Sequence, residues 1–353
     1  MSKMLEEIRE QPAALEKTLR MGLRPAARLE RAIAQKRPRM IVLAARGTSD
    51  NAAQFGRYLL EIATGIPVSL AAPSITTLYN AKIDFKDALI VAVSQSGEST
   101  DTNLVLERAR ARGAMTVGIT NEPSSTLARL AEYVFFVRAG RERSVAATKT
   151  YTGQVMLLYL LAHALGANIR IDDLQRIPEW TAKALELEAE ITARAERYRF
   201  MDHAVVVGRG LNYANAFEFA LKMMETCYVV AERFSSADFL HGPIAMVERS
   251  FPLFLFSPPG VTWDGMRDML ARLAALKAET LVITDRANRE AVESHPRAIV
   301  IPAKIAARGA RPAELFTPIP YIIPAQIFAA SLAAWKGLNP DQPRTLSKVT
   351  RTL

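Results

Sequence analysis

The sequence contains very little cysteine and histidine. Cys227 is the single cysteine among 353 residues, which excludes an intrachain disulfide and a metal cluster held by several thiolates. The four histidines show no metal-ligand spacing; they are His163, His203, His241 and His295. We therefore expect no metal site.

Long hydrophobic runs are also missing. No apolar run reaches the roughly 18–20 residues that a membrane-spanning helix needs, and the charged start MSKMLEEIREQPAALEK lacks the apolar core of a signal peptide. Half of the residues are hydrophobic, and the length suits one large or two ordinary domains. These features predict a soluble, cytoplasmic protein with no membrane partner.

Acidic residues are outnumbered, with 36 Asp and Glu against 45 Lys and Arg, a net charge of +9. The basic residues are mostly scattered, and neither a zinc-finger pattern nor an aromatic RNA-binding motif is present. A positive field also attracts small anions. We therefore predict an anionic metabolite as the partner and no nucleic acid.

What the sequence does contain is an internal repeat. Three pairs of strand-like segments recur in the same order: MIVLAARG with HAVVVGRG, DALIVAVSQSG with FPLFLFSPPG, and VGIT with LVIT. The shift is 163 residues both from Gly47 to Gly210 and from Gly97 to Gly260. Two copies of one folding unit are the simplest explanation.

Within each copy, short apolar strands alternate with helix-patterned segments such as SDNAAQFGRYLLEIAT. This alternation predicts an α/β fold, with two tandem doubly wound parallel sheets that each form a flavodoxin-like three-layer sandwich. The expected domains are a helical segment at 1–37, a first unit with linking helices at 38–198, a second unit at 199–340 and a tail at 341–353.

The clearest candidate site is the loop SQSGES, which follows the apolar run LIVAV. In open α/β sheets, ligands bind at the carboxyl ends of strands, and a helix N-terminus there offers free N–H groups to an anion. Hydroxyls add donors, and Gly97 lets the backbone approach. Because no P-loop or GxGxxG spacing is present, we predict a phosphate monoester held by Ser94, Gln95, Ser96 and Ser99.

The second copy supports this interpretation because it has Ser-Pro-Pro-Gly at 257–260, and proline has no N–H to donate. The fold evidently needs neither set of residues, so a ligand explains the donors of the first copy better. Ser49, after the first strand, is expected to join the same phosphate pocket. The alternative is an ordinary helix cap with spare serines.

Several separated motifs resemble the SIS (sugar isomerase) domain family. They are GTS at 47–49, SQSGES at 94–99, SVAATKT at 144–150, LKMMETCYVVAERFSSADFLHGP at 221–243 and DQPRTLSKV at 341–349. The resemblance covers about 38–353. It is close to the isomerase half of glutamine–fructose-6-phosphate aminotransferase and to stand-alone type II glucosamine-6-phosphate deaminases.

The resemblance implies catalytic roles for four residues. Glu225 would be the base that moves a proton between C1 and C2, with Lys222 on the same helix face, and His241 would open the sugar ring. Lys348, in the tail, would form a Schiff base with the open sugar. A solvated glutamate, a surface histidine and an unbound tail lysine are the structural alternatives.

Further residues follow from the same resemblance. Val145 and Ser347 would line the sugar through backbone contacts, and Glu232 matches another family acid, for which an ion pair is an equal alternative. In the relatives the histidine loop reaches a neighbouring subunit, so a homodimer is expected in which His241 completes the partner's site. The chemistry requires no cofactor.

The implied activity is that of an isomerase and deaminase (a hydrolase) of amino-sugar metabolism, which converts glucosamine 6-phosphate to fructose 6-phosphate and ammonia. The departure from the synthase is at the N-terminus: about 40 residues precede the first strand, without the cysteine of a glutaminase domain. The alternatives are a fructosamine-6-phosphate deglycase, an ammonia-dependent synthesis of glucosamine 6-phosphate without glutaminase activity, and a non-catalytic sugar-phosphate sensor.

Overall fold

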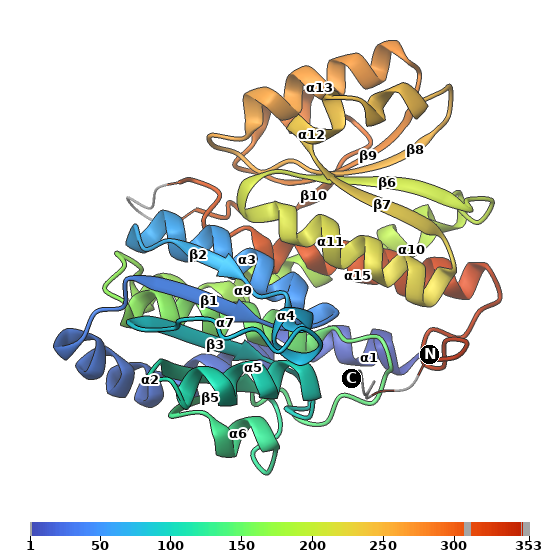
Figure 1. Cartoon of the computed structure of the whole chain (residues 1–353). Helices are drawn as coiled ribbons and strands as arrows, with labels where there is room; N and C mark the ends of the chain where they lie inside the picture. The colour runs from blue at the N-terminus through green and yellow to red at the C-terminus, as the bar shows by residue number, and fades with distance from the viewer. Residues whose placement is uncertain (1, 307–311, 347, 349–353) are drawn as a thin grey trace. The chain divides into compact units, whose positions relative to one another are not determined.

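The computed structural model describes residues 2–306, 312–346 and 348. The chain divides into two compact units (Figure 1). The first unit consists of 13–142, 147–175 and the tail from Thr345, and the second consists of 1–12, 143–146 and 176–344. Each unit contains one five-stranded parallel sheet.

The first sheet has the strand order β2-β1-β3-β4-β5. Its strands are β1 (Met40–Ala44), β2 (Val68–Leu70), β3 (Ala88–Val93), β4 (Met115–Thr120) and β5 (Tyr133–Phe136). All six residues of β3 are buried, as expected for a central strand covered on both faces. The chain runs from β1 outward to β2 but returns to add β3 on the other side, so the order reverses between β1 and β3.

Helices cover both faces of the first sheet (Figure 1). Residues of α5 pack with Val42 and Ile90, while Leu43 points to the opposite face, toward α3 and α7. The helices of this unit are α2 (Gln11–Gln35, from Ala13 on), α3 (Thr48–Thr64), α4 (Pro73–Thr77), α5 (Thr100–Arg110), α6 (Thr126–Leu130), α7 (Lys149–Ala164) and α8 (Ile171–Leu174). Three layers result.

The second sheet has the order β10-β9-β8-β6-β7. Its strands are β6 (His203–Gly208), β7 (Val230–Ser235), β8 (Pro252–Phe256), β9 (Glu279–Asp285) and β10 (Ile299–Ile301). Numbered from the start of each unit, both sheets read 2-1-3-4-5, which is the flavodoxin-like order. The predicted pair of doubly wound parallel sheets is therefore confirmed.

In the second unit, α12 and α13 lie on one face of the sheet, and α11 and α15 lie on the other (Figure 1). The helices are α1 (Lys3–Arg9), α9 (Ile177–Leu185), α10 (Glu188–Glu196), α11 (Tyr213–Lys222), α12 (Ser236–Leu240), α13 (Trp263–Ala275), α14 (Arg289–Ser294) and α15 (Pro318–Trp335). Short helical turns are η1 (Gly210–Asn212), η2 (Met223–Cys227) and η3 (Pro243–Met246). The helices α9 and α10 thus belong to the unit of the second sheet.

Helix α15 is the most apolar long helix of the second unit that the structure describes. Its 18 residues carry no charge, and its mean hydropathy of 1.2 and its length are sufficient for a membrane span. However, 89% of that window is buried inside the structure. Tyr198, Phe219 and Phe254 all pack against Phe328 of this helix, so α15 is a core helix of the second unit.

Candidate functional site

The loop after β3 is held in a tight turn by its own serines. Ser94 Oγ accepts a hydrogen bond from the Gly97 amide (3.1 Å), and Ser96 Oγ accepts one from the Glu98 amide (3.3 Å). Gly97 has a φ of +65°, and a Cβ there would lie 2.2 Å from Ser125 Oγ. Only glycine fits this conformation and this space.

The hydroxyls of this loop lie directly before α5. Ser94 is buried, whereas Gln95, Ser96 and Ser99 are half-buried and within reach of a bound molecule. Ser99 is the N-cap residue of α5, but its hydroxyl contacts Thr102 Oγ1 (3.1 Å) and does not cap a backbone N–H. The start of α5 therefore has the features of an anion site: a positive helix end with neighbouring hydroxyls.

A second hydroxyl loop follows β1, the strand next to β3. Ser49, in the first turn of α3, is buried, and its Oγ accepts a hydrogen bond from Gln154 Nε2 of α7 (2.9 Å). Arg46 in this loop pairs with Asp101 of α5 (2.8 Å). That ion pair joins the loop after β1 to the helix after β3, at the point where the strand order reverses and where such sheets bind ligands.

Arg46 was not among the residues predicted from the sequence, although it adds a cation between the two hydroxyl loops. Its side chain is 48% exposed, whereas that of Asp101 is 4% exposed. The Arg-Gly that ends MIVLAARG was recognised only as a repeat marker, because HAVVVGRG has the same pair. Through its ion pair with Asp101, Arg46 joins the loop after β1 to the start of α5; these two loops, with Ser49, Ser94, Gln95, Ser96 and Ser99, are called the strand-tip site below.

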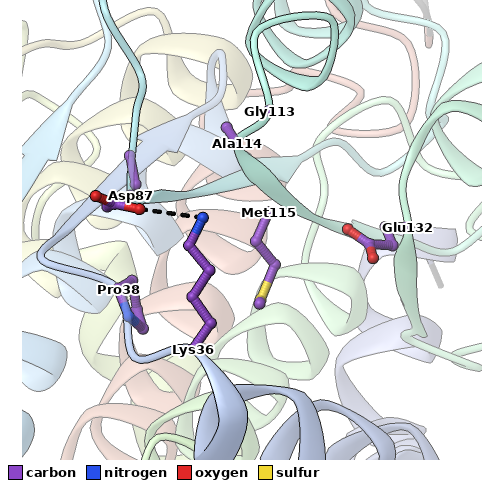
Figure 2. A pocket seen from close by; sticks show the side chains of 8 residues that line it. Lys36, Pro38, Asp87, Gly113, Ala114, Met115 and Glu132 are labelled. Atoms are coloured by element: carbon purple, nitrogen blue, oxygen red, sulfur yellow. Dashed lines mark ion pairs between the residues drawn. The ribbon is translucent and has the colours of Figure 1, made fainter.

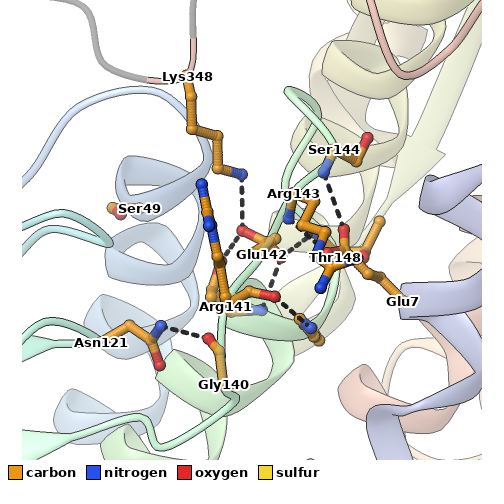
Figure 3. A network of polar contacts seen from close by, with 12 residues as sticks. Glu7, Ser49, Asn121, Gly140, Arg141, Glu142, Arg143, Ser144, Thr148 and Lys348 are labelled. Carbon is orange, nitrogen blue, oxygen red and sulfur yellow. Dashed lines mark hydrogen bonds and ion pairs between the residues drawn. The ribbon is translucent and has the colours of Figure 1, made fainter.

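The largest difference from the sequence-based expectation is a buried carboxylate, Glu142. Its side chain is fully buried in the loop between β5 and α7, and it pairs with Lys348 Nζ at 3.0 Å (Figure 3). Its other hydrogen bonds come from the Thr148 amide (2.9 Å), the Thr150 amide (3.1 Å) and the Thr150 hydroxyl (2.7 Å). The tail lysine therefore belongs to the same unit as the hydroxyl loops.

Electrostatics at Glu142 favour its charged form. Burial alone would raise the pKa of this carboxyl, but the charge of Lys348 and the donors of Thr150 and Thr148 hold the pKa below its usual value. A glutamate between two arginines reads as a surface residue, so its sequence context concealed it. The partner Lys348 lies 206 positions away.

The other proposed catalytic residues lie in the second unit. Glu225 is in the π-helical turn η2 that continues α11, and its side chain is 22% exposed. Lys222 Nζ lies 2.5 Å from Glu225 Oε2 and 3.5 Å from Glu218 Oε1. Both Glu218 and Lys222 are fully buried. Glu218, missed from the sequence, makes this a carboxylate–ammonium–carboxylate group.

Three other predicted residues are more exposed to solvent than Glu218 and Lys222: His241, Glu232 and Val145. His241 is exposed and ends α12, where its amide donates to the Asp238 carbonyl (3.2 Å). Glu232, exposed on β7, lies 3.7 Å from Arg233 in an ion pair. Val145 is half-buried, in the segment 143–146 of the second unit. Ser347 lies outside the described residues.

One cavity lies away from these residues. It measures about 190 Å³ and is lined in part by Lys36, Asp87, Met115 and Glu132, with Lys36 Nζ 3.0 Å from Asp87 (Figure 2). These residues lie at or before the amino ends of β1, β3, β4 and β5. Because ligands of parallel sheets bind at the carboxyl ends of strands, this cavity does not compete with the strand-tip loops. Among the described residues, no group of three His, Cys, Asp or Glu is placed to hold a metal.

Comparison with known proteins assigns the family. The model of the SIS domain matches twice, at residues 33–164 and 199–334, so it covers each sheet once. This chain belongs to the SIS domain family. The two matches confirm that the sequence repeat is a repeat of this domain, and the first one contains both hydroxyl loops.

Curated relatives of this SIS-domain chain include glutamine–fructose-6-phosphate aminotransferases (isomerizing). The Pyrococcus horikoshii protein is 34% identical over 98% of this chain and 57% of its own length, and the Pyrobaculum aerophilum protein is 36% identical over 98% and 56%. The chain thus spans a little over half the length of these relatives.

Two solved structures show the same fold. The C-terminal domain of glucosamine-fructose-6-phosphate aminotransferase from Francisella tularensis has a TM-score of 0.86 at 28% identity, covering 97% of this chain and 98% of that one. Glucosamine-6-phosphate deaminase from Thermotoga maritima has a TM-score of 0.78 at 21% identity, covering 99% and 100%. At the lower identity the likeness concerns the fold alone.

Proposed function

We propose that this protein is an isomerase and deaminase of amino-sugar phosphates that converts glucosamine 6-phosphate and water to fructose 6-phosphate and ammonia. The observation that carries the proposal is the pair of hydroxyl loops at the strand-order reversal of the first sheet, with the ion pair of Lys348 and Glu142 in the same unit. The hydroxyl loops offer hydrogen-bond donors to a phosphate. The ion pair holds an amine that can react with the sugar.

Phosphate binding is assigned to Ser49, Ser94, Gln95, Ser96 and Ser99. Hydrogen bonds to a charged acceptor are each stronger than neutral ones, and the N-terminus of α5 adds its positive dipole end. Backbone N–H groups and hydroxyls bind a phosphate monoester without a metal. The sugar would be anchored by its phosphate while its C1 and C2 atoms stay accessible.

The reaction moves one proton and exchanges an amine for water. After ring opening, a base removes the C2 proton, the proton is returned to C1, and the resulting C2 imine is hydrolysed to the ketone and ammonia. We assign the base to Glu225, which Lys222 holds by an ion pair of 2.5 Å. The π-helical turn is a rare local form that often occurs at functional sites.

Two further roles complete the proposal. His241, exposed at the end of α12, would open the ring of a sugar bound to the partner subunit of a homodimer. Its exposure suits a role outside its own unit. Lys348 would attack C2 of the imine and release ammonia, forming a Schiff base that water hydrolyses to fructose 6-phosphate and the free lysine amine. Val145 and Ser347 would contact sugar hydroxyls through their backbones.

The proposal is tested with purified protein and glucosamine 6-phosphate, by measuring ammonium and fructose 6-phosphate together. Equal amounts of both products are expected from the wild type, and a loss of at least about 1,000-fold in kcat from Glu225→Gln. A matched control is Glu248→Gln, an exposed glutamate of the same unit. Turnover that survives Glu225→Gln would contradict the assignment of the base.

Substrate identity is decided by the same assay. Inertness toward glucosamine 6-phosphate, with turnover of a fructosamine 6-phosphate, would replace the deaminase by a deglycase. Glucosamine 6-phosphate formed from fructose 6-phosphate and ammonium would show the synthetic direction. Binding of sugar phosphates without any turnover would identify a sensor.

A further inference from the structure

Glu142, in the loop between β5 and α7, is a buried carboxylate that also binds a residue of the C-terminal tail. Its carboxylate is fully buried, and among the described residues every hydrogen bond to it except one comes from Thr148 and Thr150 of the adjoining segment. The exception is Lys348, which reaches it from the C-terminal tail at 3.0 Å (Figure 3). A local turn thus binds a residue that is 206 positions distant.

A buried carboxylate without a cation is costly, so the tail and the loop depend on one another. Among the described residues, the carboxylate of Glu142 has one cationic hydrogen-bond partner, Lys348. Arg141 is its exposed neighbour in the loop, and Lys149 Nζ, at the start of α7, donates to the Arg141 carbonyl (2.8 Å). Lys348 is therefore the cation that balances Glu142, and its docking attaches the tail to the loop at this residue.

We propose that Glu142 is a positioning residue that holds the Lys348 amine at the strand-tip site, where the reacting end of the sugar phosphate binds. The inference rests on the proposed function and deepens it, because it names the group that places the tail lysine. Glu142 itself touches no substrate in this account. Its effect on turnover passes entirely through Lys348.

The isosteric variant Glu142→Gln separates positioning from folding. The amide oxygen of glutamine can still accept from the Thr148 and Thr150 amides, and the Thr150 hydroxyl can rotate, but the amide nitrogen faces the Lys348 amine as a second donor. We expect kcat to fall about 100-fold, since a displaced reacting group costs about that much. Glu142→Asp, which keeps the charge, should recover part of the loss, and Glu107→Gln, an exposed glutamate of the same unit, should lose nothing.

A double-mutant cycle tests whether Glu142 acts through Lys348. We expect Lys348→Met to lose at least as much activity as Glu142→Gln, and the double variant to lose no more than Lys348→Met alone. Losses that multiply would overturn the inference, because they would show an effect of Glu142 that does not depend on the lysine. Lys348→Met leaves the loop sequence intact, so it stays informative even if Glu142→Gln does not fold.

A second readout does not depend on catalysis. The rate at which an amine-reactive reagent labels Lys348, measured by mass spectrometry, should rise at least about tenfold in Glu142→Gln, because the amine loses its ion pair with the buried carboxylate. Labelling of exposed Lys86 in the same unit serves as the internal control. An unchanged rate at Lys348 would overturn the inference. A protein that is inert toward every sugar phosphate but shows the labelling change would contradict the proposed function and keep the pairing.

Discussion

The two sheets share one strand order but differ at the loop that follows their third strand. In the first unit the loop is Ser-Gln-Ser-Gly, and in the second it is Ser-Pro-Pro-Gly, at 94–97 and 257–260. The frames around these loops match. Ser94 donates its amide to the Ile119 carbonyl (3.0 Å), and Ser257 donates its amide to the Ile283 carbonyl (2.9 Å).

The matching continues in the residues that close each loop. Ser125 and Asn288 both cap the helix after the fourth strand with their side chains. Gly97 and Gly260 both have positive φ values, of +65° and +113°. The fold therefore specifies a tight glycine turn at this point and leaves the donors of the loop free to vary.

In the second unit, the side chain of Glu314 lies against the loop of 257–260. A Cβ on Gly260 would lie 2.1 Å from Glu314 Oε2, so the carboxyl of Glu314 lies against the loop. Burial raises the pKa of Glu314, partly offset by the backbone N–H groups of Glu314 and Val261. Both units thus place a buried glutamate in the loop before their last long helix, but only Glu142 is paired there with a tail lysine.

Exchanging the loops should produce the largest effect. Replacing Gln95 and Ser96 by proline copies the second loop into the first and removes two N–H donors and a hydroxyl. We expect the Kd for fructose 6-phosphate, measured by calorimetry, to rise at least about 100-fold. The reciprocal change, Pro258→Gln with Pro259→Ser, should leave it unchanged. Equal effects of both exchanges would show that the two loops do not differ in function.

The pairing of Glu142 with Lys348, which Glu314 of the second unit lacks among the described residues, should contribute to the free energy of unfolding. Lys348→Met leaves Glu142 buried without its cation, and we expect the free energy of unfolding at pH 7 to fall by about 2–3 kcal/mol. The pKa of Glu142 is lowered in the folded protein. The charged carboxylate therefore stabilises the fold at any pH above its unfolded-state pKa, and this stabilisation is lost as the pH falls through its folded-state pKa. The deficit of Lys348→Met should therefore shrink in acid, as denaturant unfolding at several pH values would reveal. A deficit that is independent of pH would contradict this pairing.

Asp285 ends β9 at the position that Asn121 occupies after β4. Burial raises the pKa of Asp285 to about 6, despite hydrogen bonds from Ala287, Ile305 and Tyr321. A raised carboxyl pKa costs stability as the pH rises through the interval from the unfolded to the folded value, by roughly 2–3 kcal/mol here. Asp285→Asn should flatten the pH dependence of Tm between about pH 4 and 6. An unchanged slope would show that Asp285 titrates normally.

The smallest expected effect concerns the two serines at the third strand ends. Ser257 Oγ is buried and has no hydrogen-bond partner among the described residues. Ser257→Ala should therefore change the free energy of unfolding by no more than about 1 kcal/mol, in the stabilising direction. Ser94→Ala, in contrast, removes the acceptor of the Gly97 amide and should destabilise the protein by about 1 kcal/mol. Thermal unfolding of both variants checks the contrast, and equal shifts would contradict it.

The central strands were predictable because they are buried on both faces. The runs around Val42, Ile90 and Val206 read as apolar strands, and the shift of 163 residues paired them. The edge strands β2 and β10 have only three residues each, too few for a pattern, and their place depends on pairing with a neighbour.

The hydroxyl loops were identified from residue type and position, whereas the buried acids were not. Glu142 and Glu218 owe their environment to contacts from other parts of their units, and each stands among residues that suggest an exposed surface or a helix face. A pattern of neighbours along the chain carries no signal for a partner 206 positions away. The role of a charged residue in a buried pair can be recognised only once the fold is known.

The most direct test of the account is a crystal of the protein soaked with glucosamine 6-phosphate. We predict density for the phosphate at the loop of Ser94, Gln95, Ser96 and Ser99, at the N-terminus of α5, with Ser49 as a further donor. The loop of 257–260 should carry none. Phosphate density at any other place, with the loop after β3 unoccupied at a saturating concentration, would contradict the account.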